Sequence, residues 1–285
     1  MIDQYHVTVS AICRILSVQV SLAGREMSTS THRVSDVIET ESDAAVVAPC
    51  DRHIVRRAHM RLSVVIPVFD EVATLETLLA RVDAVEIDKE IILVDDCSTD
   101  GTRDLLSSMN QSNRIIVFHE SNQGKGAALR TGFSRATGEY VIVQDADLEY
   151  DPNDYISLMA EARLRNAEAV YGTRFGGPRP QMAFQNWVGN RVLTWLTNRL
   201  YGAALTDMET CYKLIRRDVL TAITIESNRF NVEPEVTAKL LTNGVRIFEV
   251  PVSYVCRTHA EGKKISWLDF ISAAWTLVRL RASLR

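Results

Sequence analysis

Residues 140–152 read YVIVQDADLEYDP, and this stretch decides how the rest of the chain is interpreted. Its apolar half, residues 140–143, is typical of a buried β-strand. The acidic half places Asp145, Asp147 and Glu149 at alternate positions. Side chains two apart on an extended chain point the same way, so the three carboxylates could converge on one hard cation. The alternative is a strand end followed by a solvated acidic loop, and this stretch alone does not separate the two.

Three apolar runs precede this stretch, and a polar loop follows each of them. The first run stops at Asp70-Glu71, the second stops at Asp95-Asp96, and the third leads into the loop at residues 122–126. Segments with helical features lie between the runs. We expect strands at residues 62–69, 90–94, 114–119 and 140–143, and helices at 73–82, around 105–106 and at 127–136.

Strands and helices therefore alternate, and the strand runs are continuously apolar. This pattern is typical of an open, mostly parallel α/β sheet flanked by helices. Ligands bind beyond the carboxyl ends of the strands in such sheets. The polar loops at residues 67–71, 95–101 and 145–149 all fall at those ends. The sequence thus predicts that three acidic loops meet in one site.

Whole-chain composition excludes several classes of protein. A chain of 285 residues can bury one sizeable core, so we expect a single domain with additions. A net charge of −4 argues against a nucleic-acid binder that neutralises phosphates. Five cysteines without a C-x-x-C pair favour reduced thiols in a cytosolic setting over a disulfide framework or a zinc site. No apolar run approaches the roughly 20 residues of a membrane span, and no secretory signal is evident.

Residues 1–59 differ from the rest in composition, because hydroxyl-rich, acidic and basic stretches follow one another there. This mixture offers little for a core, so we expect a disordered N-terminal extension. One alternative is a start assigned too far upstream, because Met60 directly precedes the first strand. Another is a tail that docks on lipid through Arg52, Arg56, Arg57 and Arg61.

The motifs together resemble the family 2 glycosyltransferases of the GT-A fold, and among them the polyprenyl-phosphate hexose synthases related to dolichol-phosphate mannose synthase. The resemblance runs from about residue 60 to about residue 275, with the motifs in the family's order. One departure is Phe69-Asp70 in place of the family's usual Tyr-Asn. The motifs are VIPVFDE at 65–71, DDCSTDGT at 95–102, GKG at 124–126, DAD at 145–147, YGTR at 171–174, DMETCYK at 207–213 and EVPVS at 249–253, with Arg257 and Lys263 beyond them.

This resemblance implies a GT-A glycosyltransferase domain over residues 60–285. Residues 60–170 would form its nucleotide-sugar-binding half. Residues 171–285 would form its acceptor half, which ends in an amphipathic helix. The donor would be a GDP- or UDP-hexose, with mannose or glucose as the sugar, and transfer would proceed with inversion.

The predicted donor site combines carboxylates with a glycine-flanked lysine. Asp96 is expected to contact the base or ribose, because carboxylates accept hydrogen bonds from such groups. The alternative for Asp95-Asp96 is a strand-end turn with helix capping, and for Asp100 we prefer that alternative. The Gly124-Lys125-Gly126 segment suits a nucleotide, although a helix-initiating turn explains it nearly as well. The nucleotide-sugar-binding residues expected from the family's motifs are Pro67, Phe69, Glu71, Asp95, Asp96, Lys125, Gly126, Asp145 and Ala146.

The predicted metal is Mg²⁺ or Mn²⁺, because the nearby ligands are hard oxygens and no His or Cys accompanies them. Asp145 and Asp147 would bind it, with Glu149 as the third ligand. The metal would neutralise the charge that develops as the nucleoside diphosphate leaves.

The predicted acceptor is a polyprenyl phosphate, and cations should align its phosphate group. Arg is well suited to this task through its bidentate fork. Asp207 could act as a base, orient the sugar, or serve only as a structural carboxylate. Glu233 or Glu235 could bind sugar hydroxyls, but helix capping around Pro234 is better supported. The acceptor-phosphate candidates are Arg174, Arg191, Arg257 and Lys263, and the expected catalytic residues are Asp147, Asp207 and Arg174.

Two amphipathic segments raise the question of a membrane. Residues 184–201 and 267–278 carry Trp and Leu at helical spacing, with Arg between or after them. Most such faces pack on a core, and we prefer that interpretation. The functional alternative is that they lie in a bilayer interface and feed a prenyl chain to the site. The protein would then be cytoplasmic and peripheral to the cytosolic face of the membrane, as a homo-oligomer or with a membrane partner subunit.

Three other functions remain to be separated from this one. The same fold could use a glycan, a glycolipid or a small molecule as acceptor. A Rossmann-type oxidoreductase would need a glycine fingerprint after the first strand, where this chain has residues 67–71 instead. A catalytically idle partner subunit would not need the intact Asp145 and Asp147 pair.

Overall fold

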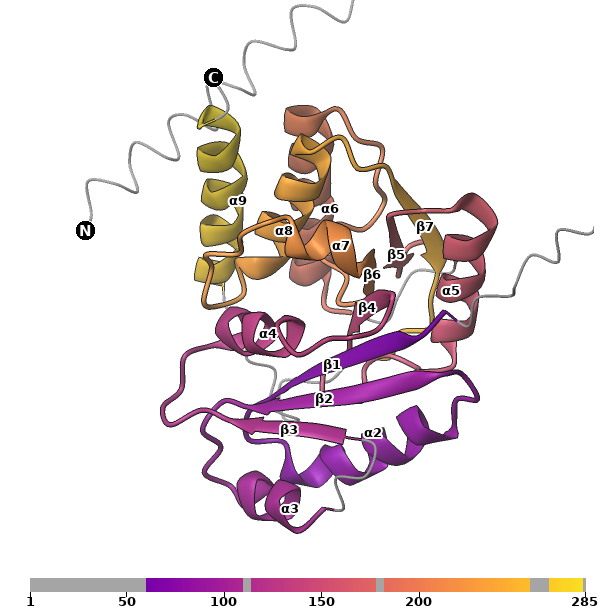
Figure 1. Ribbon diagram of the computed structural model, residues 1–285. Coiled ribbons are helices and arrows are strands. Elements are labelled where there is room, and N and C mark those ends of the chain that lie inside the picture. Colours follow the sequence, from indigo (N-terminus) through magenta and orange to yellow (C-terminus); the bar gives the residue numbers. More distant parts are fainter. Residues whose placement is uncertain (1–59, 110–113, 178–181, 257–266, 284–285) are drawn as a thin grey trace, which may run out of the picture. The chain divides into compact units, whose positions relative to one another are not determined.

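The computed structural model describes residues 60–109, 114–177, 182–256 and 267–283. Its centre is a seven-stranded sheet of order β3-β2-β1-β4-β6-β5-β7 (Figure 1). The strands are β1 (Leu62–Val68), β2 (Lys89–Asp95), β3 (Arg114–Phe118), β4 (Tyr140–Val143), β5 (Ala169–Thr173), β6 (Lys213–Arg216) and β7 (Ile247–Pro251). The helices are α2 (Val72–Ala84), α3 (Thr102–Ser108), α4 (Lys125–Phe133), α5 (Asp154–Arg165), α6 (Phe184–Tyr201), α7 (Arg217–Thr221), α8 (Val232–Thr242) and α9 (Trp267–Ala282).

The predicted mostly parallel α/β sheet is confirmed. Strands β1 to β4 are mutually parallel, β5 and β7 are parallel to each other, and only β6 runs antiparallel to its neighbours β4 and β5. Helices α2 and α3 lie on one face of the β1–β3 region and α4 lies on the other (Figure 1). Coverage on both faces is why β1, β2 and β4 are buried almost throughout, and carry continuous apolar runs, rather than being buried at alternate positions.

Pro67 lies in a central strand, where proline is normally excluded because it has no N–H to donate. The register explains the exception. Strand β4 pairs with β1 only as far as Val65 opposite Val143, so Pro67 lies beyond the end of β4 on that side. On the other side β1 continues to pair with β2 through Pro67 opposite Val94. The early end of β4 therefore leaves the Pro67 segment at the rim of the sheet.

A second hydrophobic core joins α6, α8 and α9. It shows which faces of the two amphipathic segments pack inside the protein. One face of α6 buries Leu193 and Leu196, and one face of α9 buries Ala274 and Leu277. The core-facing interpretation is confirmed for these faces. Other apolar side chains on the same two helices are exposed, namely Phe184, Val192, Trp195, Leu268 and Trp275. Among the described residues, no helix combines the length and the apolarity needed to cross a membrane.

Two local predictions can be compared directly with the fold. The sequence also indicates a strand at residues 210–213, under the sugar site. This prediction is wrong for residues 210–212, because β6 begins only at Lys213 and a turn precedes it. A helix does start around Pro234, since α8 begins at Val232 and Pro234 lies in its first turn. Its N-cap residue, Asn231, makes no side-chain capping hydrogen bond, so the capping itself is not confirmed. The predictions for residues 1–59 lie outside the described residues.

Candidate active site

The acidic loops meet as predicted, because β1, β2 and β4 are parallel and their carboxyl ends share one edge of the sheet. The Asp70 N–H donates to Ser98 Oγ at 3.0 Å, which joins the first loop to the second. Thr74 Oγ1 donates to the carbonyl oxygen of Ala146 at 2.8 Å, which joins the first loop to the third. Three segments far apart in the sequence therefore form one rim.

The third loop differs from expectation in its backbone. Strand β4 ends at Val143, and Leu148 adopts a left-handed conformation with φ of +59°. Asp145, Asp147 and Glu149 are thus not on an extended chain, and the argument from alternate positions is wrong. Asp147 Oδ1 instead accepts a hydrogen bond from the Glu149 N–H at 3.2 Å, which stabilises the turn.

The three carboxylates do not converge. Asp145 Oδ1 lies 2.7 Å from Lys125 Nζ, and Glu149 Oε2 accepts a hydrogen bond from Tyr254 Oη at 2.8 Å. Within the described residues, no group of three ligating side chains could hold a metal ion. The expected three-ligand site is therefore not formed in this conformation. One or two carboxylates that share Mg²⁺ with substrate phosphates are nevertheless a common arrangement, and Asp145 and Asp147 supply the right oxygen donors for it.

Four charges of alternating sign extend inward from Asp145. Lys125 Nζ lies 3.1 Å from Glu233 Oε1, and Glu233 Oε2 lies 2.8 Å from Lys213 Nζ. Burial opposes the charge on Lys125, but Asp145 and Glu233 hold its pKa well above the usual value. Burial likewise opposes the charge on Glu233, yet Lys213 and Lys125 lower its pKa. The network thus joins two acidic and two basic side chains at the carboxyl edge of the sheet.

Two glycines beside Lys125 are required by packing. Gly124 has φ of +95°, a conformation that favours glycine, and it precedes α4. A Cβ at Gly126 would lie 2.2 Å from the Ser227 carbonyl oxygen, and the Gly126 N–H donates to the Asn228 carbonyl at 2.8 Å. The close backbone approach is therefore to the protein's own loop, which supports the helix-start interpretation. Contact between Gly126 and a nucleotide stays a prediction.

Asp96 organises the loop that leads to α4. It is 3% exposed, and its two oxygens accept hydrogen bonds from the Gln123 N–H at 2.9 Å and the Gly124 N–H at 2.7 Å. His119 Nδ1 lies 2.7 Å from Asp96 Oδ1, and His119 Nε2 lies 2.9 Å from Thr131 Oγ1. The contact of Asp96 with a base or ribose stays a prediction, and the structure gives this residue a positioning role that the sequence did not indicate.

Asp95 and Asp100 stabilise the second loop from inside. Asp95 is fully buried, accepts a hydrogen bond from the Ser98 N–H at 3.3 Å and lies 3.7 Å from Arg103 Nε. Asp100 accepts hydrogen bonds from the N–H of Thr102, the first residue of α3, and from the N–H of Val72, the first residue of α2. The preferred capping interpretation of Asp100 is consistent with these bonds.

The Phe69-Asp70 departure has a structural explanation. Asp70 has φ of +52°, a left-handed conformation that Asn and Asp adopt more readily than other residues. Its Oδ1 accepts a hydrogen bond from the Thr99 N–H at 2.7 Å. The added negative charge is therefore directed at the second loop.

The acceptor side centres on a buried pair of opposite charges. Asp207 is fully buried, and its Oδ1 and Oδ2 accept hydrogen bonds from Arg174 Nη2 and Nε, both at 2.7 Å. Burial opposes the charge on Arg174, but Asp207 holds its pKa well above the usual value. Glu249 accepts hydrogen bonds from the N–H groups of Thr206 and Asp207. Asp207 thus holds the Arg174 guanidinium in place, and Glu249 holds the backbone around Asp207.

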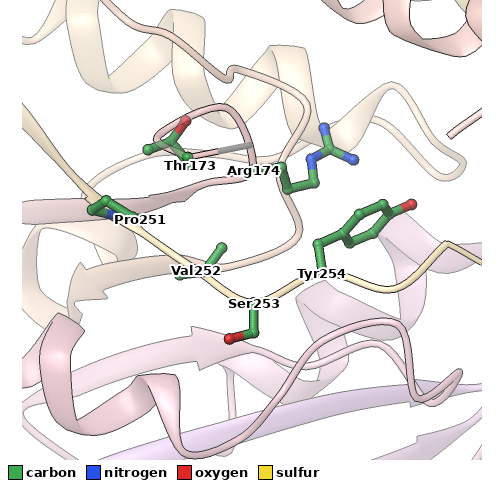
Figure 2. Close-up of a pocket in the computed structure, with 7 residues that line it drawn as sticks. Thr173, Arg174, Pro251, Val252, Ser253 and Tyr254 are labelled. Atoms are coloured by element: carbon green, nitrogen blue, oxygen red, sulfur yellow. The ribbon is translucent and has the colours of Figure 1, made fainter. Parts of the chain in front are cut away.

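A cavity of about 290 Å³ lies beside this pair. Figure 2 shows the Arg174 and Tyr254 side chains projecting from neighbouring segments of its wall, and the guanidinium lies 5.2 Å from the Tyr254 ring centroid. Arg191 lies over the Phe175 ring at 5.7 Å. The cavity is lined by Thr173, Arg174, Gly177, Pro251, Val252, Ser253 and Tyr254. Arg257 and Lys263, the other two acceptor candidates, lie outside the described residues.

The sequence profile of glycosyl transferase family 2 matches residues 63–224. This match covers β1 to β6 and the loops between them, whereas β7, α8 and α9 lie beyond it. The chain belongs to glycosyl transferase family 2. The predicted family is therefore confirmed.

Curated relatives of this family 2 chain are undecaprenyl-phosphate 4-deoxy-4-formamido-L-arabinose transferases. The protein from Pseudomonas fluorescens (strain SBW25) is 32% identical over 211 residues, which cover 71% of this chain and 59% of the relative. The protein from Pseudomonas aeruginosa (strain LESB58) is 31% identical and is covered to 60%. The chain thus spans about three fifths of the length of these relatives.

Solved structures give the same fold. Glucosyl-3-phosphoglycerate synthase from Mycobacterium tuberculosis, in complex with Mn²⁺, UDP-glucose and phosphoglyceric acid, superposes with a TM-score of 0.60 at 20% identity, covering 79% of this chain and 81% of that one. The same enzyme in complex with Mg²⁺ and UDP superposes with a TM-score of 0.57. The predicted GT-A fold of this family 2 chain is confirmed.

One residue of the family 2 site was missed from the sequence. Glu209 stands between Asp207 and Lys213 in the DMETCYK motif, but no role was assigned to it. Its Oε1 is buried and has no hydrogen-bond partner among the described residues. Burial raises the pKa of Glu209 to about 7. The available signal was a second acid two residues after the Asp of the motif.

Proposed function

We propose that this chain is the catalytic part of a transferase that moves a sugar from a nucleotide sugar to a polyprenyl phosphate. One observation carries the proposal: Arg174, fixed by Asp207, lines a cavity at the carboxyl edge of the sheet. An arginine fork held in this way suits an acceptor phosphate. Similarity to undecaprenyl-phosphate sugar transferases supports the same class of acceptor.

The engagement of Asp207 also favours a phosphate acceptor. Both of its oxygens accept hydrogen bonds from Arg174, so its role here is to position the guanidinium. A phosphate monoester has a second pKa of about 6 and is largely dianionic at neutral pH. Such a group attacks the anomeric carbon with inversion and gives up no proton, so the reaction does not require a general base. Arg191 is the second cation proposed for the acceptor, because it shares the Phe175 ring with Arg174.

The donor diphosphate is assigned to the rim next to Lys125. Asp145 and Asp147 would hold Mg²⁺ or Mn²⁺ together with that diphosphate, and the ion would neutralise charge on the departing nucleoside diphosphate. The Lys125 ammonium, 2.7 Å from Asp145, brings a further positive charge to the same place. Glu149 is proposed as an additional ligand in a conformation where it no longer accepts the Tyr254 hydrogen bond.

The base and ribose are assigned to the first two loops. Asp96, Asp95 and Glu71 are proposed to face them, together with Pro67 and Phe69 at the end of β1. The hydrogen bonds that Asp95 and Asp96 already accept keep these loops in place before a ligand binds. Preorganisation of this kind lowers the entropy that is lost on binding.

The sugar and the membrane face complete the proposal. We propose a hexose first, and the names of the relatives add 4-deoxy-4-formamido-L-arabinose as a second candidate. Trp195 and Trp275 are 45% and 47% exposed, which suits contact with the headgroup region of a bilayer on the cytosolic face. The lipid acceptor would be reached from that surface.

The test is a donor panel. The full-length protein is incubated with Mn²⁺, undecaprenyl phosphate and, separately, UDP-glucose, GDP-mannose and a nucleotide-activated 4-deoxy-4-formamido-L-arabinose. Sugar extracted into organic solvent is identified by mass spectrometry. We expect one donor to give a lipid-linked sugar. Asp147→Asn should abolish this product, while the exposed helical control Asp104→Asn should retain it.

Two results would contradict the proposal. Product that stays in the aqueous phase when soluble phosphorylated acceptors or glycans are supplied would replace the lipid with another acceptor and keep the fold. Full activity of Asp147→Asn would exclude the assigned role of that carboxylate.

A further inference from the structure

Glu209 lies between the two halves of the proposed site. The loop at residues 207–212 connects Asp207, the partner of Arg174, to Lys213, the innermost member of the Lys125 network. The charges that act on the Glu209 carboxyl come from both groups, namely Lys213 and Glu233 on one side and Arg174 and Asp207 on the other. Glu209 therefore stands where the proposed donor and acceptor regions adjoin.

The Glu209 carboxyl differs from most acids of the site in its hydrogen bonding. Among the described residues, Glu233 Oε1 is also buried without a hydrogen-bond partner, but it lies 3.1 Å from Lys125 Nζ. Asp96, Asp207, Glu235 and Glu249 each accept at least two hydrogen bonds within the described residues. Glu209 Oε1 is buried and accepts none there. A buried acceptor without a donor destabilises a folded protein, and native structures seldom retain one without a function.

The chemistry of the substrates indicates which group satisfies this oxygen. The donor diphosphate and the acceptor phosphate are anions, and a carboxylate repels both. The transferred sugar is the part of the substrates that presents uncharged O–H and N–H donors between them. Glu209 as a whole is only partly buried, although its Oε1 is buried, so a sugar bound where the two regions adjoin would lie next to this residue.

We propose that Glu209 accepts a hydrogen bond from the transferred sugar and thereby selects it. This inference rests on the proposed function, since it assumes a nucleotide-sugar donor in this site. A carboxylate that pairs with one hydroxyl or amide N–H discriminates against sugars that lack the group, because the buried oxygen would then stay unpaired. Glu209 is thus a specificity residue that touches substrate.

The experiment measures donor binding without any acceptor. Affinities of UDP-glucose, GDP-mannose, UDP and GDP are measured by calorimetry with Mn²⁺, for the wild type, Glu209→Gln, Glu209→Ala and the exposed control Glu86→Gln. We expect the wild type to bind one nucleotide sugar more tightly than its nucleotide. In Glu209→Ala that advantage should fall about tenfold or more, with unchanged affinity for the bare nucleotide. Glu86→Gln should match the wild type.

Three outcomes would overturn the proposal. They are an equal loss for nucleotide and nucleotide sugar, no loss for either, and a wild type that gains no affinity from the sugar. Glu209→Gln retains the size and a carbonyl acceptor, so it keeps the test valid if the alanine variant fails to fold. Absence of lipid-linked product in the donor panel would reject the acceptor assignment and leave the Glu209 result unaffected.

Discussion

Glu90 and Glu209 are carboxylates at opposite edges of the same sheet, and their surroundings differ in one respect. Glu90 lies at the amino-terminal edge, 6% exposed, and its oxygens accept hydrogen bonds from Ser63 Oγ at 2.5 Å, from the Thr137 N–H at 2.6 Å and Oγ1 at 2.8 Å, and from the Gly138 N–H at 3.1 Å. Glu209 lies at the carboxyl edge, and its buried oxygen accepts none within the described residues.

The two pKa values move in opposite directions for this reason. Burial would raise the pKa of Glu90, but the hydrogen bonds from Ser63, Thr137 and Gly138 outweigh burial and lower it. Burial raises the pKa of Glu209 to about 7, because nothing comparable stabilises its charge. A carboxylate whose oxygens accept hydrogen bonds within the protein stabilises the fold, whereas one with an unpaired oxygen can accept a hydrogen bond from a ligand. The edge that holds the strands together and the edge that we propose binds substrate differ in this respect.

The largest expected effect tests the carboxyl edge. Arg174→Lys keeps the positive charge but cannot form the two-pronged contact with Asp207, and we expect kcat/KM for sugar transfer to fall about 100- to 1000-fold. Steady-state assays with the donor found by the panel measure this, and Arg81→Lys on the exposed face of α2 is the control. Near-normal turnover in Arg174→Lys would show that this edge does not depend on its guanidinium.

A substitution at the amino-terminal edge should change the stability of the protein rather than its activity. Glu90→Gln replaces one acceptor oxygen with an NH₂ group that faces other donors, so we expect a loss of about 2–3 kcal/mol in the free energy of unfolding. Urea denaturation measures it, with the exposed Glu86→Gln as the control. Transfer activity of the folded fraction should be unchanged. If Glu90→Gln were as stable as the wild type, the hydrogen bonds of Glu90 would not stabilise the fold, and the two edges would not differ in this way.

Stability as a function of pH sharpens the comparison. The Glu209 pKa is about 7 in the folded state and near 4.5 when unfolded, so the folded state binds more protons between these values and the unfolding free energy should fall as pH rises through that window. Glu209→Gln should become progressively more stable than the wild type from pH 5 to pH 8. Lys213, Arg174, Glu233 and Asp207 face the same carboxyl, and the difference between variant and wild type cancels their own titration.

Glu90 should show the opposite sign, because its folded pKa is lowered. Its stabilising effect is present above the unfolded pKa and is lost as pH falls through the folded one. The difference between the wild type and Glu90→Gln should therefore shrink in acid. Both differences are obtained from chemical denaturation over a pH series. If the stability differences of Glu209→Gln and Glu90→Gln from the wild type changed with pH in the same direction, the opposite pKa shifts of the two residues would be contradicted.

The smallest expected effect concerns the exposed tryptophans. Trp195→Ala combined with Trp275→Ala removes large apolar side chains from solvent-exposed positions, so we expect binding to anionic phospholipid vesicles to weaken several-fold with little change in stability. Vesicle sedimentation measures the binding. The buried-face residues Leu193 and Leu277 give the contrast, since their replacement by alanine should destabilise the protein by about 2–5 kcal/mol. Unchanged vesicle binding would reject the proposed membrane contact of these tryptophans.

The sequence predicted the fold well because its main signal is continuous apolar runs, which require coverage on both faces. The positions of β1, β2, β3 and β4 follow from those runs, and so does the meeting of three loops at one edge. The turn at Leu148 was not predictable in the same way, because a left-handed leucine depends on contacts made by Asp147 and Glu149 after folding. Glu209 was missed because the absence of a partner is a property of three-dimensional surroundings.

The Lys125–Asp145 contact affects the order in which a divalent ion and a nucleotide would bind. A divalent ion that bound at Asp145 by itself would have to displace the ammonium of Lys125, and that ammonium would then keep Glu233 as its partner among the described residues. An ion that arrives with a diphosphate supplies a new anion for that ammonium. Cation and nucleotide should thus bind with positive cooperativity, each appearing weak in the absence of the other.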